Sequence, residues 1–500
     1  MRSTFRWLAI ILVLFATTAT HAWAAGERDI TVAQGIDAEF LDVQMTNNIV
    51  TMIINGSIYD TLLTRDKQLQ IVPALATSYK LVSDKVWEAT LRRGVKFHNG
   101  EPFDANAVKF SFERINRADF KSPQKGWFGT IERVEVVDPS TVRFHTKVPD
   151  PAMPARMTLM YQLPPKYVTQ VGDAQANLKP VGTGPFKFVE WTKNEKIVVE
   201  ANDAHWTGKP AVRRATWRPI PELGARIAAL QTGQADLIVN VPPDQVQSLQ
   251  THRNVRIEKT PSCRIISFAI AQIKGGPLAD KRVRQALNHA VDMQGILDAV
   301  LLGNGKRLNS WMPPNVWGHD PSIPFYEYNP KKAKELLAAA GQTNLTLTIQ
   351  APNGRWAMDK DIAQAVAGQL TENGIKTNVK VIGEWGAYVR TILDHKTEDI
   401  AMSGWCLPSL EPDNWVTPNL KTGEPVSQYS NPEIDKLMEQ ARSEMNSDKR
   451  KQLYSNLLRV IRDEAPYIFG YQQMDIYGVN NRIKWTPRGD ESIRLTEISF

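Results

Sequence analysis

Residues 91–103 read LRRGVKFHNGEPF, a stretch in which two glycines bracket a segment of five residues, VKFHN. Gly94 and Gly100 suit the positive φ angles that tight turns require, and few other residues adopt them readily. The alternating run before this stretch, 86–91, is typical of a strand. The run after it begins at Asp104, a good helix N-cap, and is helical in pattern to Arg114. The sequence therefore predicts a strand, a glycine turn and a helix in this order.

Strands and helices continue to alternate on both sides of this stretch. Before it we expect a strand over 28–33 and a helix over 48–63. After it the expected strands are 134–137, 141–144, 186–191, 196–201, 236–239, 345–350, 376–382 and 399–403, and the expected helices are 222–232, 280–300, 330–340, 359–373 and 447–465. Such alternation predicts mixed sheets covered by helices. The predicted fold class is α/β, with two lobes that close on a ligand by a hinge motion.

The N-terminus has the three parts of a secretory signal peptide. Arg2 and Arg6 are basic, an apolar run covers 7–16, and the small-x-small sequence AWA ends at Ala24. A membrane anchor is the alternative, but ten apolar residues are too few to span a bilayer. We therefore expect residues 1–24 to be cleaved as a signal peptide, which leaves a soluble protein in the periplasm.

The composition argues against several classes of function. The chain has 500 residues, a net charge of +7 and 42% hydrophobic residues, which is ordinary for a globular protein of two or three units. Its basic residues are scattered, and the densest groups, 331–332 and 449–451, fall on polar helix faces, so we expect no nucleic-acid partner. Neither Cys-x-x-Cys nor His-Glu-x-x-His occurs. We therefore predict no metal site and no cofactor.

A secreted hydrolase is the rival class of protein. Glu411 and Asp413 are carboxylates close in sequence, but that spacing on a loop does not make a facing pair. No Gly-x-Ser-x-Gly elbow is present. Gly-Thr-Gly at 182–184 could cradle a phosphate, but no Gly-Lys-Ser or Gly-Lys-Thr follows it, which favours a rigid turn. We predict that the chain is not an enzyme.

Seven segments match the motifs of one known family and stand in the order of that family. They are PALATSY at 73–79, LRRGVKFHNGEPF at 91–103, ANAVKFS at 105–111, VGTGPF at 181–186, AALQTGQAD at 228–236, PLADKRVRQALN at 277–288 and YNPKKA at 328–333. The chain resembles the bacterial extracellular solute-binding protein family 5, the dipeptide-, oligopeptide- and nickel-binding group of ABC importers. The resemblance implies a type II periplasmic-binding-protein-like fold of the cluster C type, in which two α/β lobes joined by a hinge carry an extra inserted domain.

The resemblance also implies how the chain divides between these units. Lobe I takes 25–68, 185–262 and 478–500, the inserted domain takes 69–184, and lobe II takes 263–477. The implied function is that of a monomeric periplasmic solute-binding subunit of an ABC importer. It captures a peptide or peptide-like solute between the lobes and delivers it to the permease in the inner membrane, without performing chemistry on it.

Ligand contacts are expected from loops at the strand ends that face the cleft. The candidates are Asp37, Glu39, Arg355, Trp356, Trp385, Tyr388, Trp405, Glu411, Asp413 and Trp415. Arg355 has a guanidinium fork that suits a carboxylate, and an ion pair within the protein is the alternative. Trp385 and Tyr388 could wall the pocket or pack in the core, and Asp37 and Glu39 could lie on a solvated loop.

Position 408 bears on which ligand is bound. Peptide-binding relatives carry an aspartate about three residues beyond the tryptophan at 405, and it pairs with the α-ammonium of the peptide; here Pro408 occupies that position. A buried ammonium needs a counter-charge. Either Glu411 or Asp413 supplies it, or the ligand is not a free-amine peptide. An opine, a glutathione-like compound, a sugar conjugate and a metal chelate remain open.

The two cysteines of the chain are Cys263 and Cys406. Cys406 follows a tryptophan as in some oligopeptide-binding relatives, which carry a second cysteine near the lobe boundary, where Cys263 stands. The resemblance therefore implies a Cys263–Cys406 disulfide, which an oxidising compartment permits. Two buried free thiols are the alternative.

Overall fold

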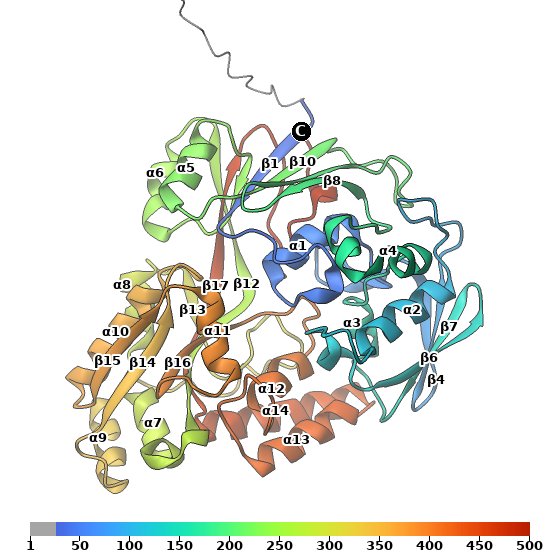
Figure 1. The fold of residues 1–500 in the computed structure, drawn as a ribbon. Helices are drawn as coiled ribbons and strands as arrows, with labels where there is room; N and C mark the ends of the chain where they lie inside the picture. The colour runs from blue at the N-terminus through green and yellow to red at the C-terminus, as the bar shows by residue number, and fades with distance from the viewer. Residues whose placement is uncertain (1–26) are drawn as a thin grey trace, which may run out of the picture.

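The computed structural model describes residues 27–500 (Figure 1). The predicted signal peptide, 1–24, lies outside this range. Within it the strands form three sheets, of eleven, four and two strands, and helices lie between them in sequence. No helix of the described range is long and apolar enough to cross a membrane. The α/β class predicted from the sequence is confirmed.

The largest sheet is mixed and extends through most of the molecule. Its strand order is β15-β14-β16-β12-β17-β11-β1-β10-β9-β8, with β13 paired to β17. The strands are β1 (Asp29–Gln34), β8 (Phe186–Thr192), β9 (Lys196–Ala201), β10 (Arg214–Pro219), β11 (Leu237–Ile238), β12 (Val255–Ile270), β13 (Gly305–Arg307), β14 (Thr346–Pro352), β15 (Lys376–Ile382), β16 (Ile400–Trp405) and β17 (Tyr467–Asn480). Figure 1 shows the long antiparallel pair β12 and β17 running from the strands around β1 to those around β14.

Helices cover the β14–β16 end of this sheet. α7 (Lys281–His289), α8 (Met293–Val300), α9 (Pro330–Ala339) and α10 (Asp359–Glu372) pack around a core that includes Leu287, Ile349 and Ile362. α12 (Asp413–Leu420), α13 (Pro432–Ser443) and α14 (Ser447–Glu464) form a second core with β12 and β17, which includes Trp311 and Tyr454. α11 (Trp385–Leu393) follows β15.

The β1 end of the sheet has a core of its own. α1 (Ile49–Ile58) packs there with the C-terminal segment around Val32, Trp217 and Leu495. α4 (Pro165–Leu178) contributes to the same core, whereas α5 (Leu223–Gln231) and α6 (Val246–Gln250) pack around Leu230 and Leu249. This end therefore combines the first and the last described residues of the chain.

A four-stranded antiparallel sheet forms a separate layer with its own core. β4 (Ala76–Ser83), β5 (Val86–Leu91), β7 (Thr141–Thr146) and β6 (Ile131–Asp138) pair in this order and pack with α2 (Ala105–Asn116) and α3 (Met153–Met157). The two-stranded sheet of β2 (Leu63–Arg65) and β3 (Ile71–Pro73) precedes it. The ranges assigned to the three units stay a prediction.

The quoted stretch 91–103 folds as its sequence predicts. Gly94 and Gly100 have φ angles of 78° and 88°. The Asp104 carboxylate accepts hydrogen bonds from the backbone N–H groups of Asn106 and Ala107, so that it caps α2. The predicted strand, glycine turn and capped helix are confirmed.

Two expected helices differ in extent, and one side chain differs in burial. The helix expected over 280–300 is two helices, because Asp292 accepts from the Gly295 N–H and starts a second helix there. The helix expected over 48–63 ends at Ile58, after which the chain is extended. Arg284, which the helical pattern places off the core, is 1% exposed because its guanidinium binds the Glu464 carboxylate and main-chain carbonyls.

Candidate functional site

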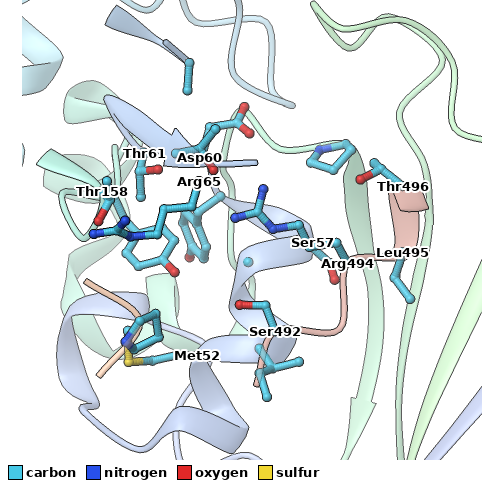
Figure 2. A pocket seen from close by; sticks show the side chains of 18 of the residues that line it. Met52, Ser57, Asp60, Thr61, Arg65, Thr158, Ser492, Arg494, Leu495 and Thr496 are labelled. Atoms are coloured by element: carbon cyan, nitrogen blue, oxygen red, sulfur yellow. The ribbon is translucent and has the colours of Figure 1, made fainter. Parts of the chain in front are cut away.

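A cavity of about 210 Å³ lies among five parts of the chain that are far apart in sequence, one of which is the segment 185–207. α1 and β2, the segment 158–161 and the C-terminal segment 490–496 line it, together with Pro408 from the loop after β16. Figure 2 shows that Arg65 and Arg494 both belong to its wall, one on β2 and the other on the C-terminal segment. Elements of two cores therefore line the cavity together with the loop in which Pro408 replaces the aspartate of peptide-binding relatives.

Two glycines let the chain pass close to the end of α1 beside this cavity. A Cβ atom on Gly182 would lie 2.1 Å from the carbonyl oxygen of Ile58, and one on Gly184 would lie 2.6 Å from it. The Gly184 N–H donates to the same oxygen at 2.9 Å. The VGTGPF motif is therefore a close-approach turn, after which Pro185 lines the cavity.

Arg65 carries a half-buried guanidinium that contacts no carboxylate within residues 27–500. Its two terminal nitrogens donate to the main-chain carbonyls of Leu69 and Ser409. Its Nε is buried and has no hydrogen-bond partner. Burial lowers the pKa of Arg65 from its ordinary value, because the charged form loses hydration. Arg65 is therefore a cation in the cavity wall with one unused donor.

Arg494 enters the same wall from the opposite end of the sequence. Its side-chain nitrogens make no hydrogen bond and no ion pair with any residue that the structure describes. Burial lowers the pKa of Arg494, and the nearby Arg488 charge lowers it further. Asp490 and Glu497 act in the opposite direction through space, so the half-buried guanidinium has nearby negative charge but no carboxylate bonded to it.

The two carboxylates of the cavity wall are already occupied by protein groups. Oδ2 of Asp60 accepts hydrogen bonds at 2.9–3.2 Å from three side chains, those of Thr183, His205 and Trp206. Asp490 binds the guanidinium of Arg488 through both oxygens, at 3.0 and 2.8 Å. Asp490 still raises the pKa of both Arg65 and Arg494 through space, but no carboxylate bonds either guanidinium, so both can donate to an anionic group in the cavity.

Three members of the predicted ligand set have a buried donor without a partner, and of these Arg355 alone carries a charge; the others are the indole nitrogens of Trp356 and Trp415. Its Nε is buried without a partner, and its guanidinium lies 5.2 Å from the ring centroid of Trp385. Burial lowers the pKa of Arg355 to about 10; the Arg264 charge also lowers it, whereas Glu491 and Glu39 raise it. Because Glu39 follows β1 and Arg355 follows β14, loops from the two ends of the large sheet approach each other here.

The carboxylates predicted near the end of β1 bind other groups of the protein. Asp37 accepts from the indole N–H of Trp191 at 3.1 Å and from a backbone N–H. Glu39 accepts from the side chains of Thr46 and Asn48 at 3.2 and 2.9 Å. Both side chains hold the loop after β1 in place.

The two carboxylates near Pro408 are also paired. Glu411 is 6% exposed and binds the Arg450 guanidinium. Asp413 binds Arg156 and Arg442, each at 3.0 Å. Neither carboxylate is left over to serve as the counter-charge that Pro408 cannot provide.

The predicted aromatic contacts divide between core and site. Tyr388 and Trp415 are fully buried, and the Tyr388 hydroxyl donates to the carbonyl of Met402 at 2.5 Å. The Trp405 indole N–H donates to the carbonyl of Asn414 at 2.8 Å. Trp356 and Trp385 pack edge to face, with ring centroids 5.7 Å apart, beneath the Arg355 guanidinium.

Cys263 and Cys406 form a disulfide with their Cα atoms 5.3 Å apart. The bond joins β12 to the loop after β16, two residues before Pro408. It therefore fixes the start of the loop that lines the cavity.

The sequence reasoning omitted both arginines of the cavity. Arg494 stands between Ile493 and Leu495, which are buried, but Ser492 and Thr496 flank these two residues, so the local sequence gives only a weak signal for it. Arg65 gives no comparable signal, because its burial depends on the distant carbonyl of Ser409.

Known proteins resemble this chain in sequence and in fold. A family model described as "Bacterial extracellular solute-binding proteins, family 5 Middle" matches residues 70–425. The glutathione-binding protein GsiB of Pectobacterium atrosepticum is 30% identical over 482 residues, which cover 93% of this chain and 92% of that protein. The oligopeptide-binding protein AppA of Bacillus subtilis is 29% identical over 444 residues, 84% of this chain and 81% of that protein.

Solved structures of related proteins have the same fold. The periplasmic binding protein DppA from Helicobacter pylori, in complex with the peptide STSA, matches with a TM-score of 0.86 and 28% identity over 95% of this chain and 98% of that one. AppA from Bacillus subtilis, in complex with a nonapeptide, matches with a TM-score of 0.83 and 26% identity over 94% of this chain and 98% of that one. The predicted cluster C fold is confirmed. The chain therefore belongs to the bacterial extracellular solute-binding proteins of family 5, the non-catalytic solute-binding components of ABC importers.

Proposed function

We propose that this chain works in the periplasm and captures a peptide-like solute whose carboxylate binds Arg355 between the two predicted lobes. The observation that carries the proposal is the buried Nε of Arg355, which has no hydrogen-bond partner in the structure. A buried cation loses hydration, and an anionic ligand group restores the lost interactions through charge-assisted hydrogen bonds. The names of the relatives GsiB and AppA, one a glutathione-binding and the other an oligopeptide-binding protein, support a solute of this class.

The surroundings of Pro408 argue against a ligand held by a free α-ammonium at that position. Glu411 and Asp413 are the nearby carboxylates, and both bind arginines of the protein. Two further carboxylates line the cavity with Pro408, but Asp490 is held by Arg488 and Asp60 by three side chains, so an ammonium placed there would lack the dedicated partner that a buried charge needs. We therefore favour a solute recognised through its acidic groups, such as a glutathione-like compound or an opine, over a generic free-amine peptide.

Binding and transport follow from the placement of the two loops. The loop after β1 and the loop after β14 belong to different predicted lobes, so a solute that touches both stabilises their closed arrangement. The permease in the inner membrane then recognises the closed form and receives the solute. We expect a monomer, which light scattering coupled to size-exclusion chromatography tests directly.

Identification of the solute is the experiment that tests the proposal. Native mass spectrometry of the protein purified from the periplasm should show a small acidic compound bound to it. In parallel, the melting temperature should rise with at least one member of a panel of glutathione, peptides, opines, sugar conjugates and metal chelates, because a ligand bound only to the folded state stabilises it. A panel that leaves the melting curve unmoved would exclude this range of solutes.

A matched pair of variants tests the role of Arg355. Arg355→Gln should weaken binding of the identified solute about 10- to 100-fold, because a hydrogen bond to a charged group contributes about 1.5–3 kcal/mol. Arg390→Gln is the control, since that side chain is 74% exposed. Equal affinities of the two variants in titration calorimetry would refute the contact.

A further inference from the structure

We infer that the cavity between Arg65 and Arg494 binds a second acidic group, so that the transported solute is a diacid or carries a phosphate besides its carboxylate. The inference rests on the proposed function, because it assigns a second subsite for the same solute. It adds a requirement for the solute that neither the family nor the Arg355 contact imposes.

The two arginines stand apart from most buried arginines of this protein. Six deeply buried arginines each contact a carboxylate: Arg114, Arg156, Arg264, Arg284, Arg450 and Arg488. Arg226 is like Arg65 in that it lacks a carboxylate, donates to main-chain carbonyls and has a buried Nε without a partner, but it does not line this cavity. Arg65 and Arg494 have neither a carboxylate contact nor a full set of acceptors within residues 27–500, and both line one cavity.

The neutral donors of the cavity complement these charges. Burial raises the pKa of Tyr161 to about 12, so its hydroxyl stays protonated at any physiological pH and can donate. Ser492 lies on the same segment as Arg494. Two cations flanked by hydroxyl donors match a carboxylate or a phosphate, whose oxygens accept several hydrogen bonds at once.

Acidic side chains of the wall do not compete for these donors. Oδ2 of Asp60 accepts from three side chains, and Asp490 is held by Arg488. Because Arg494 makes no bond within the described chain, its charge costs stability while the cavity holds no anion. An incoming anion would be stabilised by charges that are already in position, which lowers the cost of ordering the site.

Arg494→Met tests the inference with malonate and inorganic phosphate as probes. Malonate represents a carboxylate and phosphate represents a phosphoryl group, so that the probe that binds identifies the chemistry. We expect at least one probe to raise the melting temperature of the wild-type protein and to bind Arg494→Met at least tenfold more weakly. Arg213→Met is the matched control, because its side chain is 67% exposed.

The same variant has a second readout that a merely structural arginine would not give. The free Arg494→Met protein should be at least as stable as the wild type, because the substitution removes a partly desolvated charge that no carboxylate bonds. Marked destabilisation of the free protein would mean that Arg494 is a structural residue. Failure of both probes to bind the wild type, or binding that Arg494→Met leaves unchanged, would also overturn the inference.

The natural solute separates this inference from the proposed function. A solute with two acidic groups that binds Arg494→Met weakly supports both. A solute with a single acidic group, or one that Arg494→Met binds as tightly as the wild type, overturns the inference and leaves the proposed function in place. If the probes bind at Arg494 but no solute is found, the anion subsite stands and the proposed function fails.

Discussion

The guanidinium of Arg156 donates to the Asp413 carboxylate at 3.0 Å, across 257 positions of sequence. Arg156 lies on α3 beside the four-stranded sheet, and Asp413 begins α12 in the core of α12–α14. Burial acts to raise the pKa of Asp413, but Arg442 and Arg156 outweigh it and hold that pKa well below its usual range. The contact therefore joins the predicted inserted domain to predicted lobe II as a fully ionised pair.

Asp413→Asn should loosen this junction. The substitution leaves Arg156 with Asp150 as its one carboxylate partner, and breaking a buried ion pair from one side costs about 3–5 kcal/mol. We expect a lower free energy of unfolding in urea and a larger radius of gyration of the ligand-free protein in small-angle scattering. Glu439→Gln removes an exposed partner of Arg442 and serves as the control. Identical scattering and stability of the two variants would show that the pair does not hold the units together.

The disulfide gives a prediction about stability. Replacing both Cys263 and Cys406 by serine should lower the free energy of unfolding by about 2–5 kcal/mol, because the bond closes a long loop in the unfolded chain. The sequence separation of the two cysteines is 143. Reductant should lower the stability of the wild type in urea and leave the double variant unchanged. Two titratable thiols in the unreduced, unfolded protein would contradict the bond.

Local sequence was sufficient for much of the fold. Asp104 caps α2 through N–H groups two and three residues later, so the cap can be seen in a short window. Gly94 and Gly100 have the positive φ angles that their turn requires, whatever the rest of the chain does. The family motifs are made of such local features, and this is why they predicted the α/β class and the cluster C fold correctly.

The candidate site could be predicted less well, because it depends on long-range partners. Asp413 is a carboxylate of the kind that binds ligands, and for this reason the sequence suggests a ligand contact. Its partner Arg156 lies 257 positions away in sequence, and no local pattern connects the two residues. Arg284 lies off the apolar stripe of its helix, yet Glu464 and nearby carbonyls allow its burial. Whether a charge is free to bind a ligand is decided by such contacts, which only the tertiary structure contains.

Gly182→Ala should destabilise the protein through a direct clash. The new Cβ would lie 2.1 Å from the Ile58 carbonyl oxygen, and backbone has to move to relieve it. Overpacking of this kind costs about 1–3 kcal/mol, and the lost stability should appear in urea unfolding. Gly126→Ala is the control, because a Cβ at that position meets nothing within 4 Å. If the two variants are equally stable, the turn at 182–184 does not approach α1 as closely as the structure shows.

His98 should make stability depend on pH between about 4 and 6.5. Its Nε2–H donates to the Gly184 carbonyl at 2.9 Å, and its Nδ1 accepts from the Gly182 N–H at 3.4 Å. Burial lowers the pKa of His98 from 6.5 to about 4, which favours the neutral ring in the folded protein. The unfolded chain therefore binds a proton first as the pH falls. The contribution of His98 is complete above pH 6.5, and up to about 3 kcal/mol of it is lost by pH 4.

His98→Gln isolates this contribution from those of the other titrating groups. The variant should be less stable than the wild type at pH 7.5, because it loses the hydrogen bonds of His98 to Gly182 and Gly184. The difference in the free energy of unfolding should shrink by pH 4.5, because the wild type loses stability there and the variant has no ring to protonate at this position. Asn99→Ala is an exposed change beside His98 in the turn at 94–100. Its difference in stability from the wild type should not shrink as the pH falls. A difference between His98→Gln and the wild type that stays constant with pH would mean that His98 is not held neutral against the turn.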